Sequence, residues 1–186
     1  MKILTRYLEN QVQTDLKRKM VLLAGPRQCG KTTLGQKLLD TVLPENQGRY
    51  LNWDSLEDRE LILQERFPAG PGLIVLDEIH KYTRWRQVVK GLFDKRKEEI
   101  RLLVTGSAKL DHYRHGGDSL QGRYHFHRLH PLSFAEIGGT TLGDLEDLLA
   151  LGGFPEPFLS GSEKEARRWS KDYRARLVTE DLKDLE

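Results

Sequence analysis

The stretch MVLLAGPRQCGKTTL, residues 20–34, decides the fold, because a buried strand runs into a helix through a glycine-rich turn. Five apolar residues, 20–24, predict the strand, and the helix is expected over 31–43. Between them, GPRQCGKT (25–32) matches the phosphate-binding pattern Gly-x-x-x-x-Gly-Lys-[Ser/Thr]. Since this pattern stands where its mechanism needs it, between a strand and a helix N-terminus, we predict a nucleotide site here.

Each residue type in this P-loop has a mechanical reason. Glycines let the backbone curl so that successive N–H groups face phosphate oxygens, and the helix N-terminus adds partial positive charge. Lys31 is expected to reach the β- and γ-phosphates, and the Thr32 hydroxyl to ligate Mg²⁺. The alternative is a tight turn that binds no ligand. The predicted nucleotide-binding residues are Gly25, Pro26, Arg27, Gln28, Cys29, Gly30, Lys31, Thr32 and Thr33.

Two acidic residues at the end of another apolar run supply the expected metal and water partners. In LIVLDEIH (73–80), Asp77 and Glu78 stand at the carboxyl end of a predicted strand, where ligands bind in open α/β sheets. We expect Asp77 to hold Mg²⁺ through water and Glu78 to polarise the attacking water. Because a kinase must keep water from the γ-phosphate, Glu78 favours nucleotide hydrolysis over phosphoryl transfer to a metabolite. The alternative is that both acids only cap the next helix.

Further apolar runs alternate with helical patterns along the chain. Strands are predicted at 49–53, 73–76, 101–106 and 124–129. One helix face carries Trp85, Val88, Val89, Leu92 and Phe93, at positions i, i+3, i+4, i+7 and i+8. Uninterrupted apolar strands separated by helices predict an α/β fold, a P-loop NTPase core with a five-stranded parallel sheet flanked by helices.

The pattern changes beyond His130. Short helices are expected at 131–137 (PLSFAEI) and 141–151 (TLGDLEDLLAL), and a loop stiffened by two prolines at 152–158 (GGFPEPF). A final amphipathic helix is expected to carry Ala166, Trp169, Tyr173 and Leu177. We therefore interpret residues 1–130 as a P-loop ATPase core and 131–186 as a small helical lid with a C-terminal helix.

Candidates for contacting the γ-phosphate stand at the end of the fourth predicted strand and directly before the fifth. Thr105 and Ser107, in LLVTGSA, would lie beside Asp77 if the strands are ordered as in other P-loop ATPases. Arg123, in SLQGRYHF, is a candidate charge sensor or arginine finger, with an ordinary surface arginine as the alternative. The tripeptide SAK (107–109) is similar to a guanine-loop element, but the stronger guanine motif Asn-Lys-x-Asp is missing, which favours ATP.

Composition narrows the function classes. The 30 basic and 28 acidic residues give a net charge of +2, too balanced for a strong nucleic-acid-binding field. A local patch around Arg123, Arg128, Arg167 and Arg168 stays open. A single cysteine, Cys29, and the absence of an apolar segment of bilayer length predict a cytoplasmic protein without a membrane partner. The crowded histidines at 112, 115, 125, 127 and 130 have no cysteine or acidic cluster beside them, which argues against a metal site.

The assembled motifs resemble a known family, the AAA-type ATP-binding proteins of bacteria and archaea, whose ATPase core precedes a C-terminal domain of unknown function. The segments that carry the resemblance are LLAGPRQCGKTTL, YLNWDSLEDR, LIVLDEIHKYTRW, LLVTGSAKL, SLQGRYHFHRLHPLSFAEI and GGFPEPF, in order from about residue 20 to residue 158. The resemblance implies an AAA-like fold, ATP as ligand, Ser107 as a sensor and Arg123 as a functional arginine. Asp54 lies where such proteins carry an aspartate, and Cys29 replaces an expected aliphatic residue. Family members continue into a second domain, so we expect this chain to hold only the ATPase part.

The leading hypothesis is Mg²⁺-dependent ATP binding and hydrolysis, with Lys31, Glu78, Ser107 and Arg123 as the catalytic residues and Thr32 and Asp77 at the metal. The free energy of ATP hydrolysis would be coupled to an unknown macromolecular partner. The alternatives are an ATP-gated binding switch with little turnover and a DNA-processing ATPase, which the charge balance disfavours. The expected ligands are ATP, ADP and Mg²⁺. The candidate partners are a second copy of the chain, an unknown protein or a missing C-terminal domain.

Overall fold

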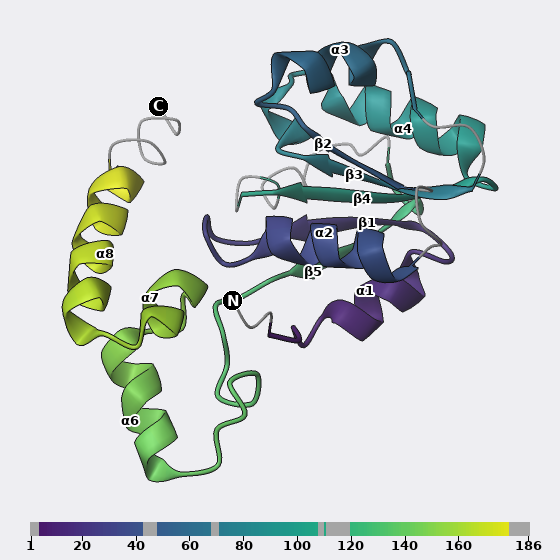
Figure 1. Ribbon diagram of the computed structural model, residues 1–186. Coiled ribbons are helices and arrows are strands. Elements are labelled where there is room, and N and C mark those ends of the chain that lie inside the picture. The colour runs from purple at the N-terminus through teal and green to yellow at the C-terminus, as the bar shows by residue number, and fades with distance from the viewer. Residues whose placement is uncertain (1–3, 43–47, 68–70, 108–109, 111–119, 179–186) are drawn as a thin grey trace. The chain divides into compact units, whose positions relative to one another are not determined.

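The computed structural model describes residues 4–42, 48–67, 71–107, 110 and 120–178 (Figure 1). Residues Thr5–His130 form one compact unit, and Pro131 and the residues after it, with Leu4, belong to a second. Within the described ranges, no helix has both the length and the apolar character that crossing a membrane requires.

The described strands of the larger unit form one parallel sheet in the order β2-β3-β4-β1-β5. These strands are β1 (Met20–Ala24), β2 (Gly48–Asn52), β3 (Gly72–Asp77), β4 (Ile100–Gly106) and β5 (Tyr124–Arg128). The predicted five-stranded parallel sheet is therefore confirmed, at nearly the predicted ranges. Because all strands run the same way, the residues that follow β1, β3 and β4 emerge at one edge of the sheet.

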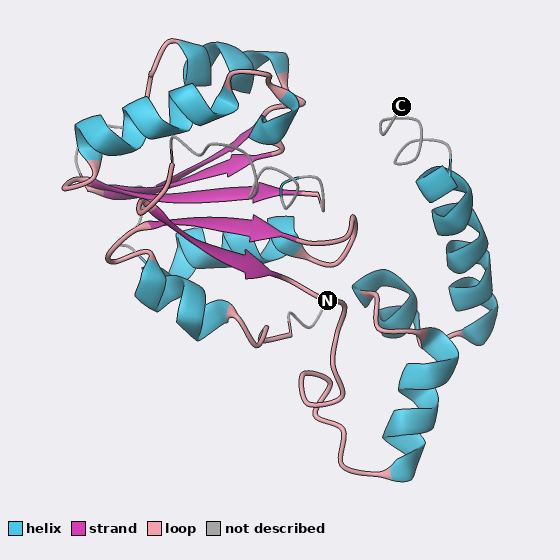
Figure 2. Ribbon diagram, turned by 180° about the vertical axis from the view of Figure 1, so that it is seen from behind, coloured by secondary structure: helices cyan, strands magenta, loops and turns pink. Residues whose placement is uncertain are grey.

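Helices cover both faces of this sheet (Figures 1 and 2). One face carries α1 (Glu9–Asp15) and α2 (Lys31–Val42), and the other carries α3 (Leu56–Leu63) and α4 (Trp85–Arg96). A 3-10 turn, η1 (Ile79–Lys81), connects β3 to α4. Every residue of β1 is buried, and alternate residues of that strand, Met20 and Leu22, join the same apolar cluster as Trp85 and Leu92. The helix face predicted over residues 85–93 is thus the face that packs on the sheet.

Two helices, α1 and α3, were not predicted from the sequence. α3 has a local start signal, since the Ser55 hydroxyl accepts a hydrogen bond from the Asp58 N–H and two acids occupy the first turn. Its apolar periodicity is weak, because Ile62 is its one buried residue. The N-cap residue was therefore the one local indication of this helix, because its hydrophobic spacing does not predict a helix.

The second unit contains α6 (Leu142–Leu151), α7 (Pro155–Ser160) and α8 (Glu163–Arg176). Two predictions for this region were wrong. Residues 131–137 form turns rather than a helix, because Gly138, at a φ of 72°, ends the segment and the Glu136 carboxylate binds the Ser133 N–H and hydroxyl. Residues 152–158 are not all loop, because α7 begins at Pro155, whose fixed φ suits the first helical position.

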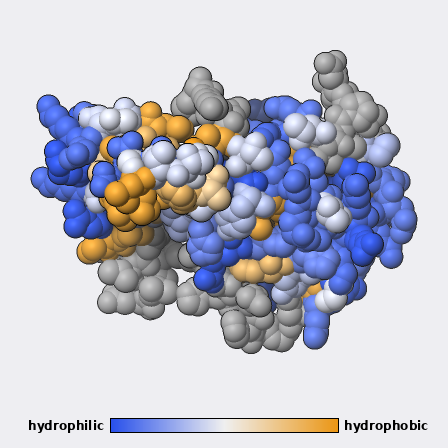
Figure 3. Space-filling view, turned by 90° about the horizontal axis from the view of Figure 1, so that it is seen from below, coloured by the Kyte–Doolittle hydropathy of each residue, from blue (hydrophilic) through white to orange (hydrophobic). Residues whose placement is uncertain are grey.

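Few side chains of these helices are buried. Among the residues of α6, α7 and α8 that the structure describes, Pro157 and Ala166 are the buried ones. The Phe154, Trp169 and Tyr173 rings pack together, with the last two stacked at a centroid distance of 4.6 Å. α6 buries no residue although leucines make up half of its sequence. Hydrophobic residues gather on one part of the face that Figure 3 shows.

Candidate nucleotide-binding and hydrolysis site

The sheet brings the predicted phosphate, metal and water residues to one edge. The P-loop leaves β1 at Ala24, and Asp77 is the last residue of β3. Thr105, in the neighbouring strand β4, stands opposite Asp77 in the strand register, and Asn52 of β2 stands opposite it on the other side. β4 therefore pairs with β3 as the sequence predicted.

The P-loop is folded around the lysine that it carries. The Lys31 ammonium donates to the Gly25 carbonyl (3.0 Å) and the Pro26 carbonyl (2.7 Å), and the residue is 6% exposed. Gln28 and Gly30 adopt positive φ values of 62° and 97°, which curl the backbone between β1 and α2. Phosphate oxygens would replace the two carbonyls as partners of the ammonium, because a charged acceptor binds it more strongly.

The other predicted loop residues differ in their exposure. Gln28, Thr32 and Thr33 are exposed, and Pro26 and Arg27 are half-buried. Cys29 is fully buried, and burial raises the pKa of its thiol, so it is a packed residue of the loop rather than a reactive thiolate.

Arg6 contacts the P-loop backbone, and no sequence pattern predicted this contact. Its guanidinium donates to the Cys29 carbonyl (2.6 Å) and to the His130 carbonyl (2.5 Å). One side chain thereby ties the P-loop to the segment that follows β5.

Gly25 has no room for a side chain, because an added Cβ would collide with the Leu129 carbonyl and lie 3.1 Å from the Cys29 sulfur. We predict that Gly25→Ala destabilises the protein by about 1–3 kcal/mol through overpacking. Gly91→Ala is the matched control, since an added Cβ there meets nothing within 4 Å and alanine is the better helix residue by up to about 1 kcal/mol. Thermal unfolding of both variants tests this, and equal shifts would contradict it.

Among the described residues, three hydroxyls converge on the Asp77 carboxylate. Thr32 donates to Oδ2 at 3.0 Å, Thr105 donates to Oδ1 at 2.5 Å, and Tyr50 also donates to Oδ2. Burial, followed by the hydrogen bond to Asp77, raises the pKa of Tyr50, so its hydroxyl stays protonated as a donor. A carboxylate beside a threonine hydroxyl is a set of hard oxygen ligands, which fits Mg²⁺.

The Tyr50 contact gives a second prediction. Removal of a partner that orients a metal-binding carboxylate weakens metal affinity by about 10–100-fold in other proteins. We expect Tyr50→Phe to raise the Mg²⁺ concentration for half-maximal nucleotide binding by about tenfold. Tyr7→Phe, which removes a hydroxyl bound to the Arg128 carbonyl instead, should leave it unchanged. Nucleotide titrations at stepped Mg²⁺ concentrations measure this, and coinciding curves for the two variants would refute it.

Glu78 occupies a special backbone position next to Asp77. Its φ of 59° is left-handed, a conformation that non-glycine residues adopt infrequently and that clusters at functional sites. Its N–H donates to the Thr105 carbonyl at 2.9 Å. Burial first, and then the charge of Asp77, raise the pKa of its carboxyl group, and the Lys81 and Lys31 charges oppose this. The result is a half-buried carboxylate with a raised pKa beside the predicted metal ligands.

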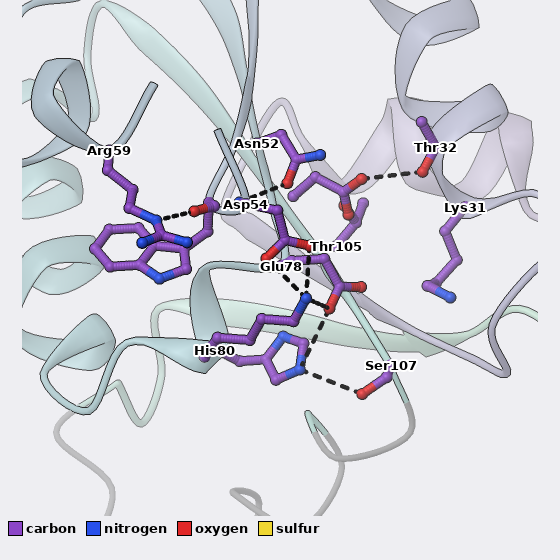
Figure 4. A network of polar contacts seen from close by, with 12 residues as sticks. Lys31, Thr32, Asn52, Asp54, Arg59, Glu78, His80, Thr105 and Ser107 are labelled. Atoms are coloured by element: carbon purple, nitrogen blue, oxygen red, sulfur yellow. Dashed lines mark hydrogen bonds and ion pairs between the residues drawn. The ribbon is translucent and has the colours of Figure 1, made fainter. Parts of the chain in front are cut away.

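Ser107 contacts a residue that the sequence reasoning passed over. Its hydroxyl lies 3.2 Å from His80 Nε2, and that nitrogen lies 3.8 Å from Glu78 Oε2 (Figure 4). Gly106 makes room for the imidazole, since an added Cβ would lie 2.5 Å from His80 Nδ1. His80 thus connects the predicted sensor residue to the predicted base, and its position two residues after Glu78 was the available signal.

Arg123 is not brought to this edge. The Arg123 carbonyl accepts from the Met20 N–H, at the start of β1, and the guanidinium binds Asp94 of α4 with distances of 2.7 and 3.1 Å. A five-residue strand is about 16 Å long, so Arg123 lies a strand length from the P-loop of its own chain. Arg123 is therefore not brought to the P-loop edge of its own chain, and its role as a charge sensor or as an arginine finger stays a prediction.

The histidines of the predicted cluster do not assemble in the described part of the chain. His127 Nε2 lies 2.7 Å from Asp15 Oδ2, and His125 lies beside Val21 in the sheet. His112 and His115 fall outside the described residues, as do Ala108 and Lys109 of the SAK tripeptide. No group of three or more potential metal ligands among His, Cys, Asp and Glu occurs within the described ranges.

Residues 17–138 match the profile of a protein family, AAA_14, described as an AAA domain. The chain belongs to this family. The match spans the P-loop, Asp77, Glu78 and Ser107, which confirms the predicted family and, with the observed sheet, the AAA-like α/β fold. As an AAA domain the chain carries a P-loop nucleotide site of the general ATPase type.

Two curated relatives are mycobacterial proteins of uncharacterized function, Mb2031c of Mycobacterium bovis and Rv2008c of Mycobacterium tuberculosis. Each is 30% identical to this AAA domain chain over 169 residues, which are 89% of the chain and 36% of the relative. The chain thus spans about a third of their length. Among solved structures, ORC1 of Aeropyrum pernix in complex with DNA is similar, with a TM-score of 0.53 at 14% identity over 78% of this chain and 50% of that one. That likeness supports the fold alone.

Proposed function

We propose that this AAA domain binds Mg²⁺-ATP and hydrolyses it to ADP and phosphate, and that the nucleotide state is coupled to a macromolecular partner. The observation that carries the proposal is the convergence of Lys31, the Thr32–Asp77 pair and Glu78 at one sheet edge. ATP is proposed rather than GTP because the guanine motif Asn-Lys-x-Asp is missing from the sequence.

The residues divide the work. Lys31 and the curled loop backbone bind the phosphates, and the ammonium offsets charge that develops on them during transfer. Thr32 and Asp77 would hold Mg²⁺, which supplies charge neutralisation between the β- and γ-phosphates. Glu78 accepts a proton from the attacking water, because a carboxylate of raised pKa is a stronger base than an exposed one. Water thereby forms the new bond to phosphorus as the ADP oxygen leaves.

Exposed apolar surface supports the coupling part of the proposal. Leu142 and Leu149 of α6 are 71% and 75% exposed, and Leu145 is 39% exposed. Apolar residues grouped on one short helix mark contact surfaces more often than scattered ones do.

The hydrolysis part is tested by phosphate release with ATP or GTP, each in Mg²⁺ and in excess chelator. We expect release with ATP and Mg²⁺, and a return to the background rate when the chelator removes the metal. Tight ATP binding in Mg²⁺ without any release above a Thr32→Ala control would contradict hydrolysis by this chain.

A further inference from the structure

Lys81 lies between two carboxylates of the site. Its ammonium is 2.6 and 2.8 Å from the two oxygens of Asp54, and 3.4 Å from Glu78 Oε2 (Figure 4). Burial acts to lower the pKa of Lys81, but the hydrogen bond to Asp54 and the charge of Glu78 raise it above its ordinary value. One cation is therefore shared unequally between two acids, and Asp54 holds the closer position.

The surrounding contacts fix this unequal sharing. Trp53 precedes Asp54 and Tyr82 follows Lys81, and their rings stack at a centroid distance of 4.8 Å. The Asp54 N–H donates to the Asn52 side-chain oxygen at 2.9 Å. Arg59 binds the Trp53 carbonyl and lies over its ring, 5.5 Å from the centroid. Asp54 and Lys81 are thus held together by packed neighbours on both of their segments.

A lysine ammonium that pairs closely with a carboxylate base competes with the attacking water for the carboxylate oxygens. The ammonium occupies a carboxylate oxygen that would otherwise be free to accept a hydrogen bond from water. At the distances observed, Asp54 takes up most of the Lys81 hydrogen bonding while the ammonium still lies near Glu78. Asp54 therefore acts on the site through Lys81.

We propose that Asp54 and Lys81 are positioning residues for Glu78, in which Asp54 draws the ammonium away and so leaves the Glu78 carboxylate available to the attacking water. This inference rests on the proposed function, because it assigns Glu78 the role of base. It also assigns a function to Asp54, the aspartate to which the family resemblance drew attention.

The kinetic test uses the variants Asp54→Asn, Lys81→Met and the double variant. Asp54→Asn leaves Lys81 with one carboxylate partner, so we expect kcat to fall about tenfold, as for loss of part of a general base, while KM for ATP changes less than about twofold. Lys81→Met alone should stay within about threefold of the unmodified chain. The double variant should recover the kcat of Lys81→Met. Glu65→Gln, which breaks a remote exposed pair with Lys95, is the matched control and should change nothing.

Recovery in the double variant is the decisive kinetic result. If Asp54 and Lys81 were merely a structural pair, either single substitution would break the same contact, and the double variant would be as slow as the single ones. A double variant as slow as Asp54→Asn, or slower, would overturn the proposal. An increase of KM instead of a decrease of kcat in Asp54→Asn would also overturn it.

A second measurement does not depend on turnover. The free energy of coupling between Lys81 and Glu78 is obtained from a double-mutant cycle, by urea unfolding of Lys81→Met, Glu78→Gln and the variant that carries both. The cycle is measured twice, once with Asp54 present and once in the Asp54→Asn background. We expect the factor by which the Lys81–Glu78 interaction changes the unfolding equilibrium constant to become about threefold larger when Asp54 is replaced by asparagine. A coupling that stays constant overturns the inference even if the chain hydrolyses ATP. A coupling that grows in a chain without turnover supports the sharing of Lys81 and contradicts the proposed function.

Discussion

We expect Lys31→Ala to abolish ATP binding at concentrations that saturate the unmodified chain. The Lys31 ammonium is buried inside the loop, with the Gly25 and Pro26 carbonyls as its partners. In the complex it would bind phosphate oxygens, and loss of one partner of a buried charge-assisted contact costs about 2–5 kcal/mol. We therefore expect the dissociation constant for ATP to rise by about 100-fold or more.

Lys37→Ala is the control for this variant. Lys37 lies on the same helix, and its ammonium binds Glu9 at 2.7 Å, away from the P-loop. ATP affinity should be unchanged in Lys37→Ala, and circular dichroism should show both variants folded. Calorimetric titration measures the affinities, and an equal loss in the two variants would mean that Lys31 acts through folding rather than through phosphate.

Glu78→Gln separates binding from hydrolysis. The amide keeps the size of the carboxylate but cannot accept a proton from water, and general-base catalysis contributes about 10²–10⁴-fold in rate. We expect kcat to fall by about 10²–10³-fold. ATP affinity should be retained or slightly increased, because one negative charge near the phosphates is gone.

The matched change for Glu78→Gln is Glu99→Gln, which removes an exposed ion pair with Arg96 outside the site. Steady-state rates over a range of ATP concentrations give kcat and KM for both variants. A Glu78→Gln variant that turns over ATP as fast as Glu99→Gln would remove Glu78 from the mechanism.

The positions of the P-loop and of the Asp77–Glu78 pair were predictable because each is encoded by a run of consecutive residues. A strand, a tight turn and a helix N-terminus follow one another over residues 20–34, and an apolar strand leads directly into the two acids. Short-range order of this kind needs no knowledge of the tertiary fold. The parallel sheet followed from the same runs, since uninterrupted apolar strands separated by helices have few other arrangements.

The supporting contacts were not predictable in the same way. Tyr50 reaches Asp77 because β2 pairs with β3, and Arg6 reaches Cys29 and His130 across long sequence separations. No local pattern marks either residue. The place of Arg123 was not predictable either, because it depends on which end of β5 the residue adjoins. Arg123 adjoins the start of β5, at the sheet edge opposite the P-loop. Lys81 and His80 stood beside Glu78 in the sequence, but their partners, Asp54 and Ser107, lie just after the ends of β2 and β4.

The central claim, that this AAA domain hydrolyses ATP with Glu78 as base, is tested most directly by a single-turnover experiment. Protein in excess over labelled ATP is mixed with Mg²⁺, quenched at intervals, and the bound nucleotide is separated into ATP and ADP. We predict that the unmodified chain converts its bound ATP to ADP while Glu78→Gln binds the same amount and retains ATP. Equal binding with intact ATP in both proteins over the same period would contradict the claim.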